Sequence, residues 1–330
     1  MRKQADKSNF NRDNLIGADL IGADLREANL EGADLRETNL EGANLREAKL
    51  IKANLNGSNL KRSNLIGADL REANLEGAIL EESILEGTNL DETNLKGATL
   101  FGGANEAILM RTQLTKANIK KATLMRAQLT RADLRGANLE EANLREANLE
   151  EANLGETNLK KSNLGGTNLE KANLDVTNLE KANLGGANLS SAHLLRAALR
   201  GADLREANLE GANLEGANLE GALLASAHLE GANLIRADLK GADLREANLL
   251  WSDLRGANLK MANLGKTHIE GADLEKANLE EANFEGANLE GARNLSFDQL
   301  SKVKTLYNTK LDKELIILLK ERYPALFKAP

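Results

Sequence analysis

The chain has 330 residues, a formal net charge of −7 and no cysteine, so disulfide bonds, thiolate metal sites and cysteine nucleophiles are excluded. Aromatic residues are 2% of the composition, and no apolar run approaches the roughly 20 residues that a membrane-spanning helix needs. Residues 1–9 form a polar lead without the apolar core of a signal peptide, which makes a cytoplasmic protein the expectation.

From Phe10 to Leu289 a large apolar residue, nearly always Leu, recurs every fifth position with one interruption. The residue two places before it is almost always Ala, Ser or Thr, and the residue directly before it is mostly Asn or Asp. Such regularity is typical of a repeat protein. We therefore expect one repeat domain over residues 10–292, which specifies a shape rather than a reactive centre.

A period of five fits neither an amphipathic helix nor an alternating strand. The first and third residues of each repeat lie on one side of a short extended segment, and the next two must turn the chain. Glycines such as Gly17, Gly22 and Gly32 occupy the fifth position, where a tight turn needs positive φ. Each repeat is thus predicted to form one flat side and one corner, with Leu and Ala buried inside stacked coils.

This pattern of a small residue, Asn or Asp, Leu or Phe, and two variable residues resembles the pentapeptide-repeat family. The resemblance implies an all-β solenoid, a right-handed quadrilateral parallel β-helix with four repeats per coil. Longer members of that family carry a short α-helical C-terminal cap. The corresponding residues here include Asn294-Leu295, Gln299-Leu300, Leu306-Tyr307 and Leu311-Asp312.

The period breaks at residues 101–108. Leu100 and Leu109 are nine rather than ten residues apart, and Gly103 to Ala107 look like a repeat without its Leu. Two interpretations stay open, a tolerated slip in the helix and a functional contact loop.

A basic belt follows the break, with Asp133 as the only acidic residue within it. Either it is a solvated surface or it contacts an acidic partner. No aromatic residue is interleaved to stack on bases, so nucleic acid is not an expected partner. The belt consists of Arg111, Lys116, Lys120, Lys121, Arg126, Arg131 and Arg135.

Leu250 and Trp251 occupy two positions where polar residues are expected, and the pattern points both outward. An exposed Trp is a reasonable anchor for a protein interface, although single exposed apolar residues are also common. The histidines His193, His228 and His268 all replace the Asn or Asp of a repeat. With four repeats per coil no two of them share a metal, so neither a metal nor a cofactor is expected.

The C-terminal residues 293–330 are predicted to form a helical cap. Ser296 and Gln299 fit a capping box that opens a helix to about Leu306. Asp312 is expected to cap a second helix that runs through Arg322 and ends before Pro324. Its apolar run is wider than one helix face, so it covers the last coil and also suits a homodimer contact. That run is Leu315, Ile316, Ile317, Leu318 and Leu319.

The exposed N-terminal coil needs a cover as well. Three alternatives stay open: Phe10 and its neighbours plug it, two copies meet there, or sequence preceding this chain covers it.

These observations favour a non-enzymatic scaffold for protein interactions, with an unknown partner and no small-molecule substrate. The regular convex surface offers no cleft for paired catalytic carboxylates. One alternative, implied by the quinolone-resistance branch of the family, is a DNA mimic that binds topoisomerase (gyrase). Another is a regulator that binds a single cellular protein.

Overall fold

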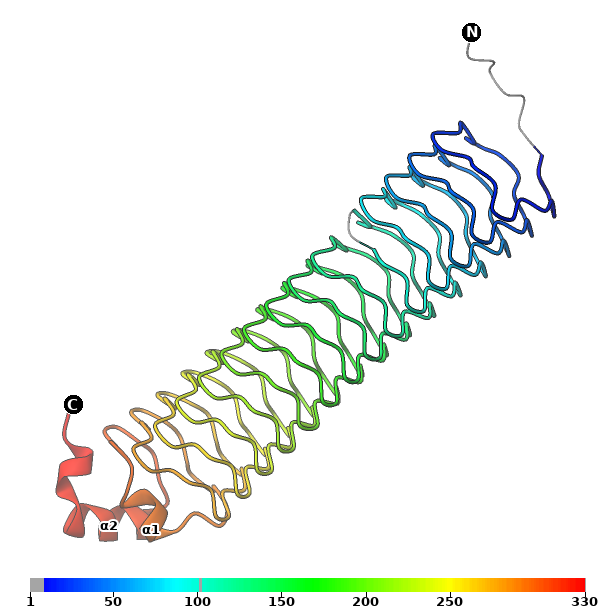
Figure 1. The fold of residues 1–330 in the computed structure, drawn as a ribbon. Helices are drawn as coiled ribbons and strands as arrows, with labels where there is room; N and C mark the ends of the chain where they lie inside the picture. The colour runs from blue at the N-terminus through cyan, green and yellow to red at the C-terminus, as the bar shows by residue number, and fades with distance from the viewer. Residues whose placement is uncertain (1–8, 101–102, 330) are drawn as a thin grey trace. The chain divides into compact units, whose positions relative to one another are not determined.

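The computed structural model describes residues 9–100 and 103–329. The chain divides into two compact units, Met1–Asn168 and Leu169–Pro330. Within each unit the backbone winds in stacked coils (Figure 1). The polar lead up to Ser8, and Phe101 and Gly102 of the break, lie outside the described residues.

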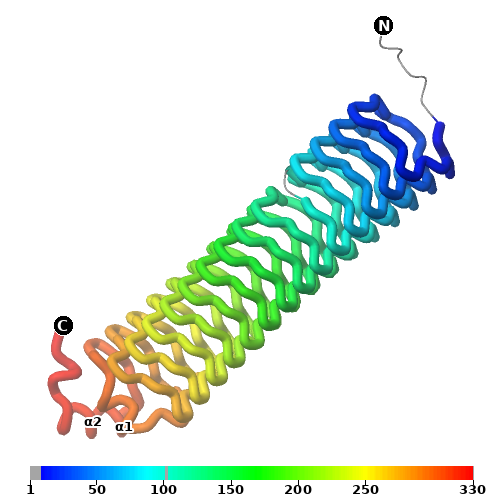
Figure 2. Tube along the Cα trace, in the orientation of Figure 1, coloured from blue at the N-terminus to red at the C-terminus, as the bar shows by residue number. Residues whose placement is uncertain are grey.

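Parallel bridges between successive coils set the register. Asn9 pairs with Asn29 and Asn14 with Asp34 in the first unit, and Asn173 pairs with His193 in the second. This step of 20 residues equals four repeats, so each unit is a right-handed, four-sided parallel β-helix, as the resemblance implies. The coils of each unit repeat a single outline (Figure 2).

Backbone hydrogen bonds join each coil to the next. The N–H of the third residue donates to the next coil, as from Leu30 to the Lys49 carbonyl at 2.7 Å. The fifth residue does the same at the corner, as from Gly32 to the Ile51 carbonyl at 2.9 Å. A turn closes each corner, where the N–H of Ala33 donates to the Leu30 carbonyl at 3.1 Å. The backbone groups are thus paired without long strands.

The fifth residue of each repeat has a positive φ whether or not it is glycine. Gly32 has φ 64°, and Glu37, which fills the next corner, has φ 57°. The prediction that the corner needs a positive φ is therefore confirmed. Many charged residues adopt this conformation as well as glycine. Each such residue carries a strain of roughly 1–2 kcal/mol relative to a right-handed conformation.

The second residue, Asn or Asp, stabilises both the corner and the stack. The side-chain oxygen of Asn59 accepts from the N–H of Lys61 at 3.1 Å, which fixes the turn. Its amide donates to the side chain of Asn39 on the preceding coil at 3.1 Å. The second residue is mostly Asn or Asp because its side chain stabilises both the turn and the stacking of the coils.

Leu and Ala fill the interior, as predicted. Leu30 and Ala33 are fully buried, and Phe284 occupies a Leu position with no exposure. Burying each Leu stabilises the fold by roughly 1.5–3 kcal/mol. At the N-terminal end Phe10 and Leu15 stay half-buried, whereas Leu25 is buried.

The break shortens one coil to 19 residues, because Ile84 pairs with Gly103 and Thr99 with Asn118. Gly103 takes the second position and Ala104, fully buried, takes the third. The repeat there therefore has an Ala in place of its Leu, and the missing residue falls between Leu100 and Gly103.

The C-terminal helices are α1 (Phe297–Leu300), α2 (Lys313–Arg322) and the 3-10 helix η1 (Pro324–Phe327). The capping box of Ser296 and Gln299 is present. The prediction that the first helix reaches Leu306 is wrong, because the chain returns to the β-helix after α1. Thr305 pairs with Asn283 and Lys310 with Asn288, and Leu306 is buried like a repeat Leu.

The second helix has the expected bounds, but its cap differs from the prediction. Asp312 lies at the N-cap without a side-chain capping bond, and its carboxylate instead accepts from the N–H of Gly291 at 3.0 Å. The coil around Leu289 is continued by residues 305–311 rather than covered by α2, since Leu289 donates to the Lys310 carbonyl. Helix α2 contacts α1 and η1 instead.

Candidate functional site

The corner that carries Trp251 differs from its neighbours in the stack. Trp251 is a fifth-position residue with φ 60°, whereas Gly231 and Gly271 fill that position one coil before and one coil after. A bulky residue with left-handed backbone is strained, and glycine meets the same turn without a penalty. The indole is 69% exposed, as the sequence predicted for this residue.

The Trp251 ring packs on the bare backbone of the following corner. A Cβ atom placed on Gly271 would lie 2.3 Å from Cε3 of the indole, so only glycine leaves room for the ring. Gly271 is buried as a result. The ring is therefore held on one face and open on the other.

Leu250 is half-buried rather than fully outward. Its position in the repeat is filled by Glu230 one coil earlier and by Glu270 one coil later. The glutamate side chains are only 29% and 27% exposed. An apolar side chain thus lies between two partly buried carboxylates.

Each of these carboxylates has the same set of neighbours. Oε1 of Glu230 accepts from Nδ2 of Asn248 and lies 3.7 Å from Nδ1 of His228. Glu270 repeats the arrangement with Asn288 and with His268 at 3.8 Å. In both glutamates Oε2 is buried and has no hydrogen-bond donor among the residues that the structure describes.

Sequence reasoning did not single out these glutamates. The signal was present as His-x-Glu-Gly at residues 228–231 and again at 268–271, two coils apart and on either side of Leu250-Trp251. His228 and His268 share a column of bridges through Asn248, and His193 lies in another column. Among the described residues no group of three His, Asp or Glu side chains is arranged to hold a metal.

The basic belt lies in the first unit and is largely neutralised by neighbouring coils. Arg131 meets Glu151 at 2.7 Å, and Lys120 meets Glu140 at 2.9 Å. The hydrogen bond from Lys120 lowers the pKa of Glu140, and the pKa of Lys120 is raised in turn. Further pairs are Arg111 with Asp91, Lys121 with Glu141 and Arg126 with Glu106. Within residues 9–100 and 103–329, Lys116 forms no such pair.

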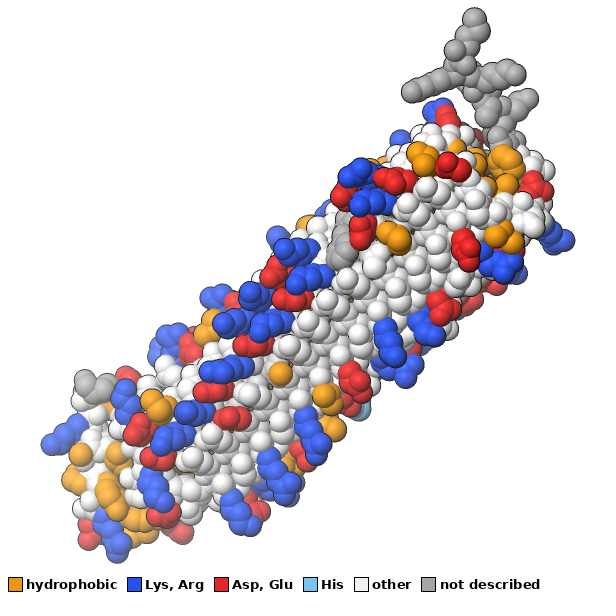
Figure 3. Space-filling view, viewed as in Figure 1, with side chains coloured by type: hydrophobic (Ala, Val, Ile, Leu, Met, Phe, Trp, Pro, Cys, Tyr) orange, Lys and Arg blue, Asp and Glu red, His pale blue; other side chains and the backbone are white. Residues whose placement is uncertain are grey.

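Exposed arginines also pair with aspartates two residues earlier in the same repeat. Arg255 binds Asp253 with Nε–Oδ1 at 2.8 Å and Nη2–Oδ2 at 2.6 Å. This hydrogen bonding holds the pKa of Asp253 below its ordinary value. The visible surface accordingly shows cations and carboxylates side by side (Figure 3). The same fork occurs at Asp34-Arg36, Asp69-Arg71, Asp133-Arg135, Asp203-Arg205 and Asp243-Arg245.

Helix α2 keeps an apolar face uncovered. Leu319 is buried and Leu315 and Ile316 are half-buried, but Ile317 is 66% and Leu318 46% exposed. The predicted apolar run thus divides into a packed side and an open side.

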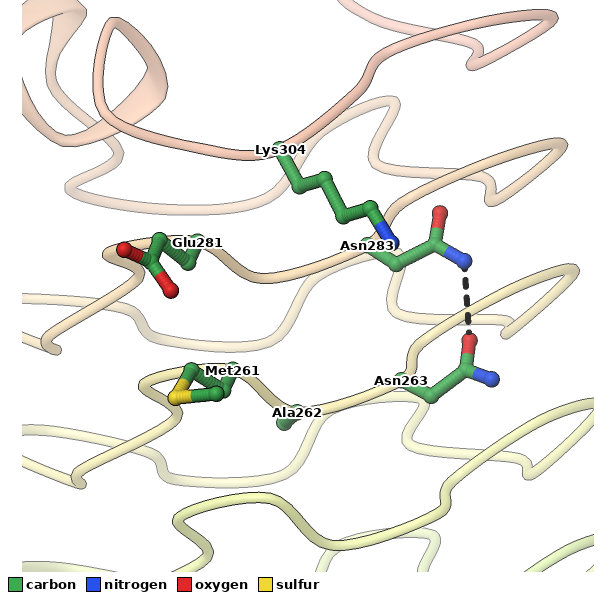
Figure 4. A pocket seen from close by; sticks show the side chains of 6 residues that line it. All are labelled: Met261, Ala262, Asn263, Glu281, Asn283 and Lys304. Carbon is green, nitrogen blue, oxygen red and sulfur yellow. Dashed lines mark hydrogen bonds between the residues drawn. The ribbon is translucent and has the colours of Figure 1, made fainter. Parts of the chain in front are cut away.

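A groove of about 430 Å³ lies near the C-terminal end of the second unit, lined by Met261, Ala262, Asn263, Glu281, Asn283 and Lys304. The side-chain amide of Asn283 donates to the side-chain oxygen of Asn263 on the neighbouring coil, and Lys304 lies beside Asn283 (Figure 4). The ionisable side chains of this groove are one lysine, Lys304, and one glutamate, Glu281.

The family model described as pentapeptide repeats, in eight copies, matches residues 6–102 and 107–293 of the chain. The chain belongs to the pentapeptide repeat family. Comparison with curated protein sequences gives no significant match. No helix within residues 9–100 and 103–329 is long and apolar enough to cross a membrane.

Solved structures of the same family resemble the chain. HetL, a protein involved in heterocyst differentiation regulation in the cyanobacterium Nostoc sp. strain PCC 7120, is 32% identical over 74% of this chain and 89% of its own, with a TM-score of 0.27. Rfr23 from the cyanobacterium Cyanothece 51142 is 28% identical over 41% and 88%, with a TM-score of 0.25. QnrB1, a plasmid-mediated fluoroquinolone resistance protein, is 19% identical over 67% and 99%, with a TM-score of 0.38.

Proposed function

We propose that this pentapeptide repeat protein is a non-enzymatic scaffold that binds a partner protein through Leu250 and Trp251. The observation that supports this most is the exposed indole at a strained corner where adjacent coils carry glycine. Exposed aromatic residues of this kind anchor protein interfaces, since they bury a large area with few rotatable bonds. The basic belt takes second place because most of its cations are already paired.

Affinity capture with immobilised protein tests this contact. Proteins enriched by the wild type should be lost with the double variant Leu250→Ser, Trp251→Ala. Met261→Ala is the matched control, because Met261 is also a fifth-position residue with φ 59° and an exposed side chain. A partner that binds both variants equally would contradict the proposal.

We also propose that the open side of α2 pairs with α2 of a second copy. Ile317 and Leu318 are neighbours on that side, and a two-fold axis would bury the same two residues from both chains. Leu319 is buried, and α2 already contacts α1 and η1, so pairing needs no refolding of the cap.

A DNA mimic that binds gyrase remains the alternative reading of the family resemblance. Arginines that pair with aspartates in the same repeat reduce the continuous negative field that mimicry of a duplex needs. A gyrase supercoiling assay with a ciprofloxacin challenge separates the two, since the scaffold proposal predicts no effect at a large excess of protein.

A further inference from the structure

The face that carries Trp251 has a charge unlike that of the other three. Five consecutive coils contribute the repeats 207–211, 227–231, 247–251, 267–271 and 287–291 to it. These repeats contain four glutamates and no Lys or Arg: Glu210, Glu230, Glu270 and Glu290. On each of the other three faces of the same coils at least two Lys or Arg accompany the acidic residues.

The four glutamates also lack the partners that acidic residues have elsewhere in this unit. Glu220 lies 3.4 Å from Arg200, and Glu280 lies 3.0 Å from Lys260. Within the described part of the chain, the only basic side chains paired with Glu230 and Glu270 are histidines, and no ion pair involves Glu210 or Glu290. The negative field on the Trp251 face is therefore not cancelled locally.

No Lys or Arg of residues 9–100 or 103–329 lies over the indole of Trp251. The cation–π contacts among the described residues are both in the C-terminal cap, Lys320 over Phe327 and Arg322 over Phe297. Arg293 contacts this corner through its Nε, which donates to the Gly271 carbonyl at 3.1 Å. A Trp face of this kind attracts an ammonium or guanidinium group, and neighbouring carboxylates add to the attraction.

We propose that the Trp251 face binds an extended, lysine- or arginine-rich segment of a partner protein. This inference rests on the proposed contact at Trp251 and adds the chemistry of what binds there. One cation of the segment stacks on the indole, and others pair with glutamates to either side. The corner presents no obstructing side chains, because the fifth-position residues around Trp251 are Gly211, Gly231, Gly271 and Gly291.

The dimensions of the face suit such a segment. Glu210 and Glu290 are four coils apart, which is about 19 Å at roughly 4.8 Å per coil. About six residues of extended chain cover this length at roughly 3.3 Å per residue. A short basic peptide laid across the coils therefore spans the positions of all four glutamates and of the indole.

The emission of Trp251 reports binding directly, because it is the only Trp in the chain. The probe is a peptide of about eight residues that alternates Lys and Ala, and the control peptide carries Glu in place of Lys. We expect a saturable change in tryptophan emission with the Lys peptide and none with the Glu peptide. The affinity should fall with added salt, since exposed charges are screened within about 10 Å at 0.1 M ionic strength.

Paired variants decide whether the glutamates of this face are responsible. Glu230→Gln with Glu270→Gln should weaken binding of the Lys peptide about tenfold, equivalent to about 1.4 kcal/mol. Glu281→Gln with Glu285→Gln makes the same change of net charge on the other faces and should leave the affinity unchanged. Equal losses in the two double variants, or equal binding of the Lys and Glu peptides, would overturn the inference.

The two proposals can fail separately. If a captured partner is lost on Trp251→Ala while the Lys peptide does not bind, the contact at Trp251 stands and its basic ligand is wrong. Thermal melts followed by far-UV circular dichroism should show the same fold in both double variants. At positions 230 and 270, Gln keeps the acceptor oxygen that Asn248 and Asn288 use.

Discussion

The indole of Trp251 lies on Gly271, the residue that occupies the same corner one coil later. A Cβ on Gly271 would come within 2.3 Å of the ring, and its φ of 67° already disfavours any side chain. The preceding glycine of this corner, Gly231, has a φ of 63° and no atom within 4 Å of an added Cβ. Substitutions at these two glycines therefore distinguish the cost of backbone strain from the cost of contact with the indole.

Gly271→Ala should destabilise the protein more than Gly231→Ala. Both variants place a side chain at positive φ, at a cost of roughly 1 kcal/mol. Only Gly271→Ala also displaces the indole, which adds about 1 kcal/mol or more of overpacking. Urea unfolding measures the two free energies, and Trp251 emission should change in Gly271→Ala alone. Equal losses with identical emission spectra would show that the ring does not pack there.

Trp251→Gly should be more stable than Trp251→Ala. Both lose the ring, but glycine also removes the left-handed strain, which is worth roughly 1 kcal/mol. Urea unfolding of the two variants side by side measures the difference. A more stable Ala variant would mean that this corner does not have positive φ in solution.

Deleting residues 205–224 should leave a folded protein, because the bridge step in this unit is 20 residues and Leu204 would be followed by Ala225 in the same phase. Stability of stacked repeats is approximately a sum of nearest-neighbour terms, so one coil is lost and the remainder keeps its contacts. Deletion of Asn208 alone should lower the melting temperature further.

The reason is that Asn208 belongs to a flat side rather than to a corner. The natural 19-residue coil lacks a residue between Leu100 and Gly103, and Gly103 and Ala104 keep the register. Loss of Asn208 instead moves Leu209 out of its column. Circular dichroism melts compare the two deletions, and a higher melting temperature for the Asn208 deletion would contradict the stacked-coil description.

Ile317→Lys with Leu318→Lys should convert a dimer to a monomer without loss of the fold, because both side chains are exposed within one chain. Size-exclusion chromatography with light scattering measures the mass of each form. Leu319→Lys is the contrasting variant: Leu319 is buried, so its substitution should unfold the cap. A wild-type monomer would remove the proposed pairing of α2.

The Asp–Arg forks should make stability fall in acid. Hydrogen bonds from arginine hold the pKa values of Asp203, Asp243 and Asp253 below the ordinary value of 3.8. Their contribution is present above that ordinary value and is lost as the pH falls through the lowered folded values. Because the arginines are about half exposed, each fork contributes little and salt weakens it.

Melting temperatures measured from neutral pH to about pH 2 test this expectation. The triple variant Asp203→Asn, Asp243→Asn, Asp253→Asn should show a shallower decline below the ordinary pKa than the wild type. Parallel curves for the two proteins would assign the acid loss to other carboxylates.

Several features could be predicted because they depend only on neighbours along the chain. Leu30 and Ala33 are the third residue of one repeat and the first of the next, and the alternation within each repeat places both inside. The left-handed corner at Gly32 follows because the chain must turn within the last two residues of the repeat. The repeat at residues 305–311 escaped prediction. Thr305 and Lys310 replace the usual Asn, and the preceding capping box suggested a longer helix.

The candidate site divides in the same way. The sequence by itself determined that Trp251 is exposed and that the interior is filled with Leu and Ala. Only the tertiary structure decided that the indole rests on Gly271, that Leu250 lies between Glu230 and Glu270 and that the basic belt is paired. Such contacts join residues 20 positions apart through side-chain rotamers, which the period of the sequence leaves free.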